Sequence, residues 1–182
     1  MTGVLRDILD RAGVFQYGIV DPREAEFTLE ARKYCEDNAC GRYGKTWACP
    51  PAVGTTDECR ERARRYDRML VFSCKFGING REDYSGMRAG LKDFKETAGR
   101  LGDELRPYLK DYLPLCDVGG CDNCEKCSYP DPCRFPGMGG GSVESWGIYA
   151  DRLARLAGIR YDNGADTITY FGAILFNGDV LL

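Results

Sequence analysis

Three cysteines at two-residue intervals constrain this chain more than any other feature of its sequence. They are Cys121, Cys124 and Cys127, in the segment GGCDNCEKCSYPDPCRFP. Two-residue gaps let the thiolates of one tight loop reach three corners of an iron–sulfur cube, and backbone amides of such a loop stabilise the negative charge of the cluster. Cys133 follows just before the letters RFP, a longer version of the cysteine–proline tail of bacterial ferredoxins. The spacing therefore favours a [4Fe–4S] cluster on this segment.

Zinc is the alternative metal for the same thiols. Structural zinc sites use four cysteine or histidine ligands and more usually draw them from two separated C-x2-C pairs. The chain has ten cysteines and no histidine. The absence of histidine excludes zinc fingers with paired cysteine and histidine ligands, Rieske centres, histidine-ligated haem and any mechanism that needs an imidazole base. A zinc site here would therefore have four cysteine ligands.

A second group of cysteines lies earlier in the chain. Its members are Cys35, Cys40 and Cys49, in the segment CEDNACGRYGKTWACPP. Cys49 precedes two prolines, which is typical of a ligand that leaves a cluster loop, while Tyr43 and Trp47 suit a tight loop with aromatic cover over a metal. Three cysteines are one short of a full ligand set. The fourth ligand could be Cys133, Cys116 or a non-protein species.

The remaining cysteines carry weaker signals. In the apolar run at residues 69–76, Cys74 shares one face with Leu70 and Phe72 by the two-residue alternation of a strand, so we expect it in the core. Cys59 lies on the inner stripe of a short Arg-rich helix, which gives the same expectation. Cys116 ends an apolar stretch and directly precedes the second cysteine segment, so the sequence leaves its role open.

The pattern of apolar residues predicts the fold. The chain has 182 residues, 43% of them hydrophobic, which suits a single domain over residues 1–182 with a substantial core. Helical spacing predicts helices over residues 4–12, 23–34, 55–66, 87–109 (kinked at Pro107) and 152–157. Apolar runs predict strands over residues 15–20, 69–76, 159–161 and 167–176. This alternation predicts an α/β fold with a central sheet packed by helices, and with two cysteine-rich metal loops, at about 35–54 and 116–142, meeting at one edge.

Charge and hydropathy bear on partners and location. The formal net charge is −3, which argues against general nucleic-acid binding. No apolar run approaches the roughly 18 residues of a membrane span, and the N-terminal residues lack a signal-peptide apolar stretch, so we expect a cytoplasmic protein without a membrane partner. Five arginines crowd one predicted helix and its end: Arg60, Arg62, Arg64, Arg65 and Arg68. They form either a solvated face or a docking patch for an acidic redox partner protein.

These motifs together resemble a known family. The segments C-x4-C-GRYGKTWACPPAVG, GGCDNCEKCSYPDPCRFP and GADTITYFGAILF resemble, in this order, the predicted metal-binding family catalogued as domain of unknown function 2284. The resemblance implies a cysteine-rich, metal-binding protein of a kind common in anaerobes, without an assigned reaction. The cysteines shared by motif are Cys35, Cys40, Cys49, Cys121, Cys124, Cys127 and Cys133. The glycine-rich residues 137–142 depart from the family pattern, which puts a substrate role of that stretch in doubt.

Two functions follow from these observations. The first is an iron–sulfur protein with one or two [4Fe–4S] clusters, acting as an electron carrier or an oxidoreductase, either alone or as a homodimer. The seven motif cysteines divide into four and three, so a cluster on the smaller group would leave one iron open to a small-molecule substrate. The second function is a structural zinc module with four cysteine ligands, in which the metal supplies folding energy for loops that bind a partner.

Overall fold

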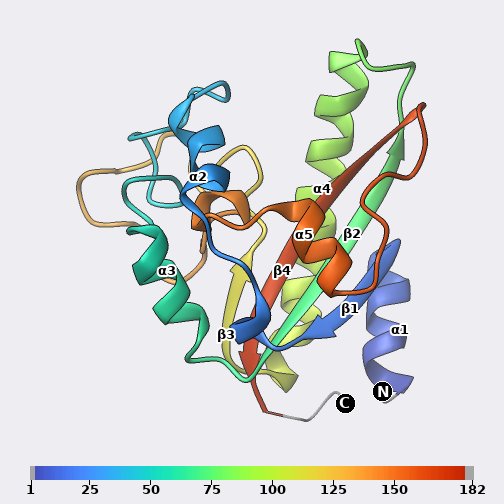
Figure 1. The fold of residues 1–182 in the computed structure, drawn as a ribbon, viewed down its shortest axis with the longest axis horizontal. Helices are drawn as coiled ribbons and strands as arrows, with labels where there is room; N and C mark the ends of the chain where they lie inside the picture. The colour runs from blue at the N-terminus through green and yellow to red at the C-terminus, as the bar shows by residue number, and fades with distance from the viewer. Residues whose placement is uncertain (1–2, 179–182) are drawn as a thin grey trace.

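A four-stranded antiparallel sheet forms the centre of the computed structural model, which describes residues 3–178 (Figure 1). The strands are β1 (Gln16–Val20), β2 (Arg68–Gly77), β3 (Lys110–Leu115) and β4 (Thr167–Asn177), in the order β1-β2-β4-β3. The central strands β2 and β4 pair along their whole common length, from Arg68 opposite Phe176 to Gly77 opposite Thr167. The strands predicted at residues 15–20, 69–76 and 167–176 are confirmed, and so is the mixed α/β class of this single domain.

Helices cover both faces of the sheet and give three layers. The helices are α1 (Gly3–Ala12), α2 (Leu29–Glu36), α3 (Thr56–Ala63), α4 (Tyr84–Leu105) and α5 (Ala150–Leu156), with 3-10 turns η1 (Pro22–Glu24), η2 (Arg106–Tyr108) and η3 (Glu144–Trp146). Leu70 and Phe72 of β2 pack with α1 and α4, whereas Met69 and Val71 pack with α3, η3 and α5. Both faces of β2 are therefore buried, which explains its almost unbroken apolar sequence.

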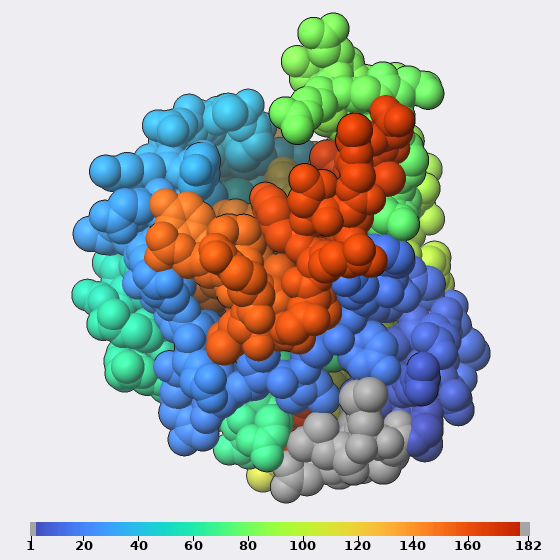
Figure 2. Space-filling model, turned by 45° about the vertical axis from the view of Figure 1, so that its right-hand side comes forward, coloured from blue at the N-terminus to red at the C-terminus, as the bar shows by residue number. Residues whose placement is uncertain are grey.

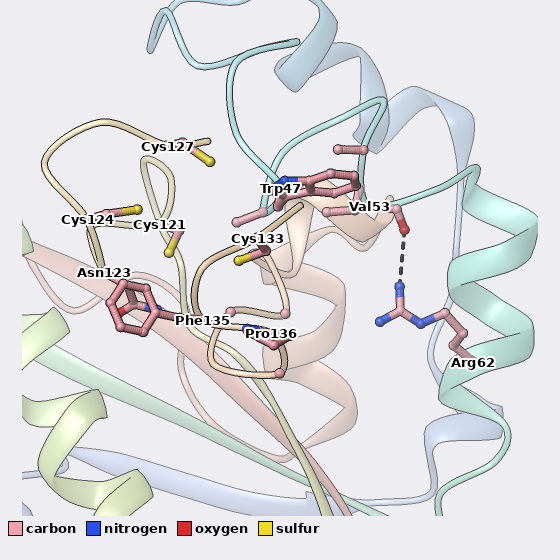
Figure 3. A pocket seen from close by; sticks show the side chains of 15 residues that line it. Trp47, Val53, Arg62, Cys121, Asn123, Cys124, Cys127, Cys133, Phe135 and Pro136 are labelled. Carbon is pink, nitrogen blue, oxygen red and sulfur yellow. Dashed lines mark hydrogen bonds between the residues drawn. The ribbon is translucent and has the colours of Figure 1, made fainter. Parts of the chain in front are cut away.

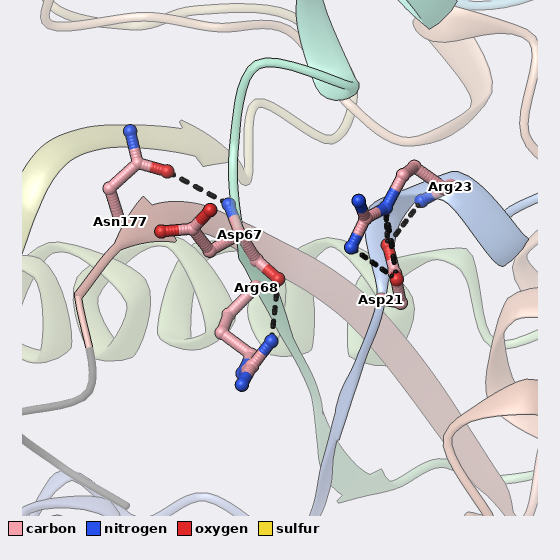
Figure 4. Close-up of polar contacts among 5 residues, drawn as sticks. All are labelled: Asp21, Arg23, Asp67, Arg68 and Asn177. Carbon is pink, nitrogen blue, oxygen red and sulfur yellow. Dashed lines mark hydrogen bonds and ion pairs between the residues drawn. The ribbon is translucent and has the colours of Figure 1, made fainter.

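The helix predicted over residues 23–34 is shorter than expected and is preceded by a separate turn. Asp21 accepts hydrogen bonds from the backbone N–H and the guanidinium of Arg23, and so caps only the turn η1 (Figure 4). Phe27 then forms an isolated antiparallel bridge with Ile148, which takes the chain out of helical geometry. A new helix, α2, begins after Thr28, whose hydroxyl accepts from the N–H of Ala31 at 3.1 Å.

Two other predictions need correction. Helix α4 ends at Leu105, and the residues expected to continue it form η2 and then the edge strand β3. Pro107 cannot donate the backbone hydrogen bond that a continuing helix needs, which accounts for the stop. Residues 159–161 form no strand, because the side chain of Gln16 takes the place of a neighbouring strand: its Oε1 accepts from the N–H of Arg160 at 2.9 Å.

Both cysteine segments lie on the side of the sheet that β3 borders (Figure 1). The first connects α2 to α3, and the second follows β3. A side-chain contact joins the start of β2 to the end of β4. There the side chain of Asn177 accepts a hydrogen bond from the N–H of Asp67 at 2.8 Å (Figure 4). Among residues 3–178 no helix has both the length and the apolar character that crossing a membrane requires.

Candidate metal centre

The second cysteine loop is closed at its base by backbone pairing. Cys116 and Ser142 form an isolated antiparallel bridge, and the N–H of Asp117 donates to the carbonyl of Gly141 at 3.0 Å. The carboxylate of Asp117 in turn accepts from the N–H of Gly141 at 3.0 Å. Residues 117–141 are thereby held as one closed loop beside the edge strand, which fixes where its cysteines can lie.

The glycine run at residues 137–141 allows this closure. A Cβ on Gly140 would lie 2.1 Å from the carbonyl oxygen of Pro114, and one on Gly141, where φ is +98°, would lie 2.4 Å from Oγ of Ser145. A Cβ on Gly139 would lie 3.4 Å from the sulfur of Cys121. Side chains are therefore excluded where the loop returns under β3, and close packing accounts for these glycines without a bound phosphate.

The four cysteines of the second loop line one cavity of about 230 Å³ (Figure 3). They are Cys121, Cys124, Cys127 and Cys133. Figure 3 shows their side chains around a common space, with the indole of Trp47 from the first loop at its border and Phe135 and Pro136 on the same wall. The sequence predicted these four thiols as a group, and the fold brings all four to one cavity.

Burial governs the protonation of Cys121 in the absence of a metal. Burial, with smaller contributions from the charges of Asp117, Cys124 and Cys127, raises the pKa of Cys121 to about 11. At neutral pH this thiol is therefore protonated unless a cation replaces the proton. Thiolate ligands lose their protons when they bind a metal, so this environment suits a metal more than a free reactive thiolate.

The thiols of the first cysteine group influence one another by charge. Burial is the main cause that raises the pKa of Cys35 to about 11, and Cys49 and Cys40 add to it by charge. Cys40 likewise adds to the effect of burial on the pKa of Cys49. Cys49 is buried and Cys40 is exposed. Cys49 and Cys40 therefore lie within range of the charge of Cys35, and Cys40 lies within range of the charge of Cys49.

A buried hydroxyl beside Cys49 lacks an ordinary partner. Thr46 is 2% exposed, and its Oγ1 makes no hydrogen bond within the described residues. Burial raises the pKa of Cys49. The hydroxyl of Thr46 lies close enough to this thiol to offset part of that rise. A hydroxyl placed in this way can donate to a thiolate, which fits a cysteine that ligates a metal.

Arg32 is a feature of this site that the sequence analysis missed. It is only 5% exposed, and its guanidinium donates to the carbonyls of Ser145 and Gly54. No carboxylate among residues 3–178 forms an ion pair with it, although it lowers the pKa of Cys35 by charge. A buried cation without a counter-ion is costly, and negative thiolates beside it would supply the missing charge. Its position three residues before Cys35, on the same face of α2, was the available signal.

The two cysteine loops contact each other directly. The indole N–H of Trp47 donates to the carbonyl of Asp131 at 2.9 Å, and its ring packs edge-on against Tyr129 with 5.1 Å between ring centroids. Asp122 pairs with Arg42 of the first loop at 3.3 Å and with Lys95 of α4. The two cysteine segments therefore contact each other in the fold.

Asp117 acts by charge on thiols of both groups, and the sequence analysis gave it no role. Its charge raises the pKa of Cys121 in the second loop and that of Cys49 in the first. Burial raises the pKa of Asp117 itself to about 6, partly offset by hydrogen bonds from the loop backbone and by Lys95. One carboxylate therefore influences both candidate metal sites.

Comparison with protein families agrees with this geometry. A family model described as a predicted metal-binding protein (DUF2284) matches residues 18–176. The chain belongs to this family. The match includes both cysteine segments and the whole sheet except the first two residues of β1 and the last of β4. No curated protein and no solved structure matches the chain.

The remaining cysteines of this DUF2284 protein belong to the core. Cys59 and Cys74 are 0% and 2% exposed, and each lies in one of the two hydrophobic clusters, as predicted. Cys116, which the sequence left open, packs against the cluster of α1 and α4, and its sulfur lies 3.6 Å from the carbonyl oxygen of Ala173. Burial raises the pKa of Cys116, and the charges of Asp117 and Cys74 add to this effect. The structure thus separates Cys116 from the cavity of the second loop.

The donor set fits a thiolate-bound metal, although the thiols would have to draw together to bind it. Among residues 3–178 no group of three or more Cys, Asp or Glu side chains is arranged so that it could hold a metal ion as it stands. Binding by cysteines couples metal uptake to the ordering of the loop that carries them. Four thiols on one cavity, and three more near a buried arginine, are the chemistry that iron–sulfur clusters and zinc share.

Proposed function

We propose that this protein is an iron–sulfur protein that transfers electrons or carries out a cluster-based redox reaction. The observation that carries the proposal is the single cavity lined by Cys121, Cys124, Cys127 and Cys133. Four thiols complete the ligand set of one [4Fe–4S] cluster, and the C-x2-C-x2-C spacing favours that cluster over zinc. A cluster at this position would supply one-electron transfer.

The surrounding residues would exclude water and balance charge. Trp47 covers the cavity from the first loop and is held by its hydrogen bond to Asp131. Lys95 donates to the carbonyl of Gly120 at 2.8 Å, which places a cation beside the start of the cysteine motif. Hydrogen bonds, nearby charge and solvent exposure set the reduction potential of such a centre, so these residues are the ones we expect to tune it.

The first group would hold a second cluster with one iron not ligated by the protein. Cys35, Cys40 and Cys49 lie within range of one another's charge, and Cys116 packs against the core cluster that contains Cys74. A position without a protein ligand is where a substrate or a small thiol could bind. In this arrangement the second loop is the electron-transfer site and the first group is the site of chemistry.

The rim of the cavity is where we expect a redox partner protein. Trp47 and Phe135 line the cavity and are 36% and 44% exposed. Exposed aromatic side chains at the rim of a site are typical of protein contacts. The Arg-rich helix α3 is a weaker candidate, because Arg60 and Arg64 already pair with acidic residues of the same helix.

The experiment is spectroscopy on protein that is purified without oxygen. We expect broad visible absorption that bleaches on reduction, together with an electron paramagnetic resonance signal in the reduced sample. Colourless protein that contains zinc and gives no such signal would contradict the proposal and support the structural zinc module with four cysteine ligands. A control sample of the same chain with Cys124 changed to Ser reports whether the signal comes from the second loop.

A further inference from the structure

A second, larger cavity of about 580 Å³ lies apart from the cavity of the second cysteine loop. Helices α2 and α5, the turn η3 and the segment before β4 contribute its walls. Its polar and aromatic lining consists of Tyr34, Glu144, Tyr149, Asp151, Arg152 and Tyr161. Figure 2 shows this side of the molecule, where the orange segment that includes η3 and α5 lies between the blue N-terminal segment and the red-orange residues before β4. Cavities of this size with a few converging polar groups are typical of small-molecule sites.

Glu144 gives the cavity an uncompensated negative charge. Burial raises the pKa of Glu144, and the hydroxyl of Ser142 acts in the opposite direction. No basic side chain among residues 3–178 forms an ion pair with it. Glu144 is half-buried, and a partly desolvated carboxylate without a cationic partner is unfavourable, so a bound cation would stabilise its charged form.

The arginines around the cavity are already engaged. Arg152 pairs with Glu26 of the segment before α2, and Arg155 pairs with Asp151 at 2.8 Å. Arg32 donates to the backbone carbonyls of Ser145 in η3 and of Gly54. The part of the chain that the structure describes therefore supplies charge partners for Glu26 and Asp151 but none for Glu144.

Three tyrosine rings line the cavity together with this carboxylate. Tyr34 and Tyr149 meet edge to face with 6.1 Å between ring centroids. Tyr161 stacks one face on Phe171 at 5.2 Å, so only its other face can be presented to the cavity. The guanidinium of Arg152 lies 4.7 Å from the centre of the Tyr149 ring, so the protein's own cation already contacts this ring. Aromatic faces next to a carboxylate are the recognised chemistry for ammonium groups.

We propose that this cavity binds a small organic cation, with its ammonium group against Glu144 and the rings of Tyr34, Tyr149 and Tyr161. The proposal does not depend on which metal the cysteines hold. It has a consequence for the site, because Glu144 acts by charge on Cys35. A cation bound at Glu144 would therefore lie next to the first cysteine group, where the second cluster is proposed to have an open iron.

The test is a calorimetric titration of the anaerobically purified protein at low salt. The probe is tetramethylammonium, and tert-butanol is the uncharged compound of similar shape. We expect saturable binding of tetramethylammonium and none of tert-butanol. Glu144→Gln should weaken binding at least about tenfold, because a desolvated charge contact is lost. Glu82→Gln, an exposed glutamate in the loop before α4, is the matched control and should bind as the unmodified protein does.

Three results would overturn the proposal: no saturable binding, equal binding of tert-butanol, or equal affinities for Glu144→Gln and Glu82→Gln. Tyr161→Leu covers the case in which Glu144→Gln fails to fold, since Tyr161 is 52% exposed. This variant should weaken binding several-fold, as expected for one cation–π contact. Unchanged affinity in a folded Tyr161→Leu protein would contradict the placement of the cation.

Discussion

Trp47 in the first cysteine loop donates a hydrogen bond to the backbone carbonyl of Asp131 in the second, at 2.9 Å. The same ring packs edge-on against Tyr129. One side chain thus fastens together two segments that are 84 positions apart in the sequence. We interpret Trp47 as the cover of the cavity that the four cysteines line and as the link between the two candidate metal sites.

Trp47→Phe should loosen this link without unfolding the protein. The variant keeps an aromatic ring but loses the hydrogen bond, at a cost of about 1 kcal/mol. Opening of the loop should then be several-fold more frequent. The measurement is the rate at which an iron chelator removes iron from anaerobic protein. Tyr43→Phe, in the same loop, is the control; equal rates for the two variants would contradict a role of Trp47 as cover.

Arg32→Met should be strongly destabilising. The substitution leaves the carbonyls of Ser145 and Gly54 without their donor and removes the buried charge that acts on Cys35, so we expect a loss of about 3 kcal/mol in the free energy of unfolding. Denaturant unfolding measures this loss. Arg23→Met is the matched control, because Arg23 forms a solvent-screened pair with Asp21, and exposed ion pairs contribute little to stability. Similar losses in both variants would argue against a special role of Arg32.

Cys116→Ser should keep its metal. The sulfur of Cys116 lies in the core beside Ala173, away from the cavity of the second loop, so a serine there should reduce stability slightly but leave the metal content unchanged. Cys124→Ser, by contrast, removes one of the four thiols of the cavity. The measurement is the metal content per chain of the two variants, which shows whether Cys116 or Cys124 is a ligand. Loss of metal from the Cys116 variant would show that Cys116 is a ligand and would undo the division into four and three.

Asp117→Asn should change how stability depends on pH. Burial raises the pKa of Asp117 in the folded protein to about 6, above its ordinary value, so the folded state holds this proton more tightly than the unfolded chain does. The stabilisation is complete at low pH and is lost as the pH rises through 6. Between pH 5 and pH 8 the unmodified protein should therefore lose about 1 kcal/mol relative to Asp117→Asn. A constant difference in unfolding free energy across this range would refute the assignment.

The sequence predicted the strands and the cysteine groups better than the connections between them. Strands β2 and β4 are buried along most of their length, and their apolar runs indicate this directly. The shortening of the helix around Arg23 could not be predicted, because it depends on pairing between Phe27 and the distant Ile148. Strand β3 is short and partly exposed, so its apolar signal is weak.

In the candidate site, too, contacts between segments that are distant in the sequence could not be predicted. The spacing of the cysteines predicted which thiols share a loop, because residues that are close in the sequence are close in any fold. Asp117 and Glu144 act on those thiols from separate elements, and no local pattern marks them as partners. Arg32 shares helix α2 with Cys35, so its spacing was the one local signal. The role of Cys116 was also undecidable from sequence, because its position at the end of β3 is compatible with both the core and the loop.

The iron and acid-labile sulfide content of the protein tests the central claim most directly. We predict about four iron and four sulfide per chain for each cluster in protein purified without oxygen, with the set on the second loop lost in Cys124→Ser. Cys59→Ser, a change in the core, should lose none of it. Protein that contains no sulfide and about one zinc per chain would contradict the account and leave a structural zinc site with four cysteine ligands in its place.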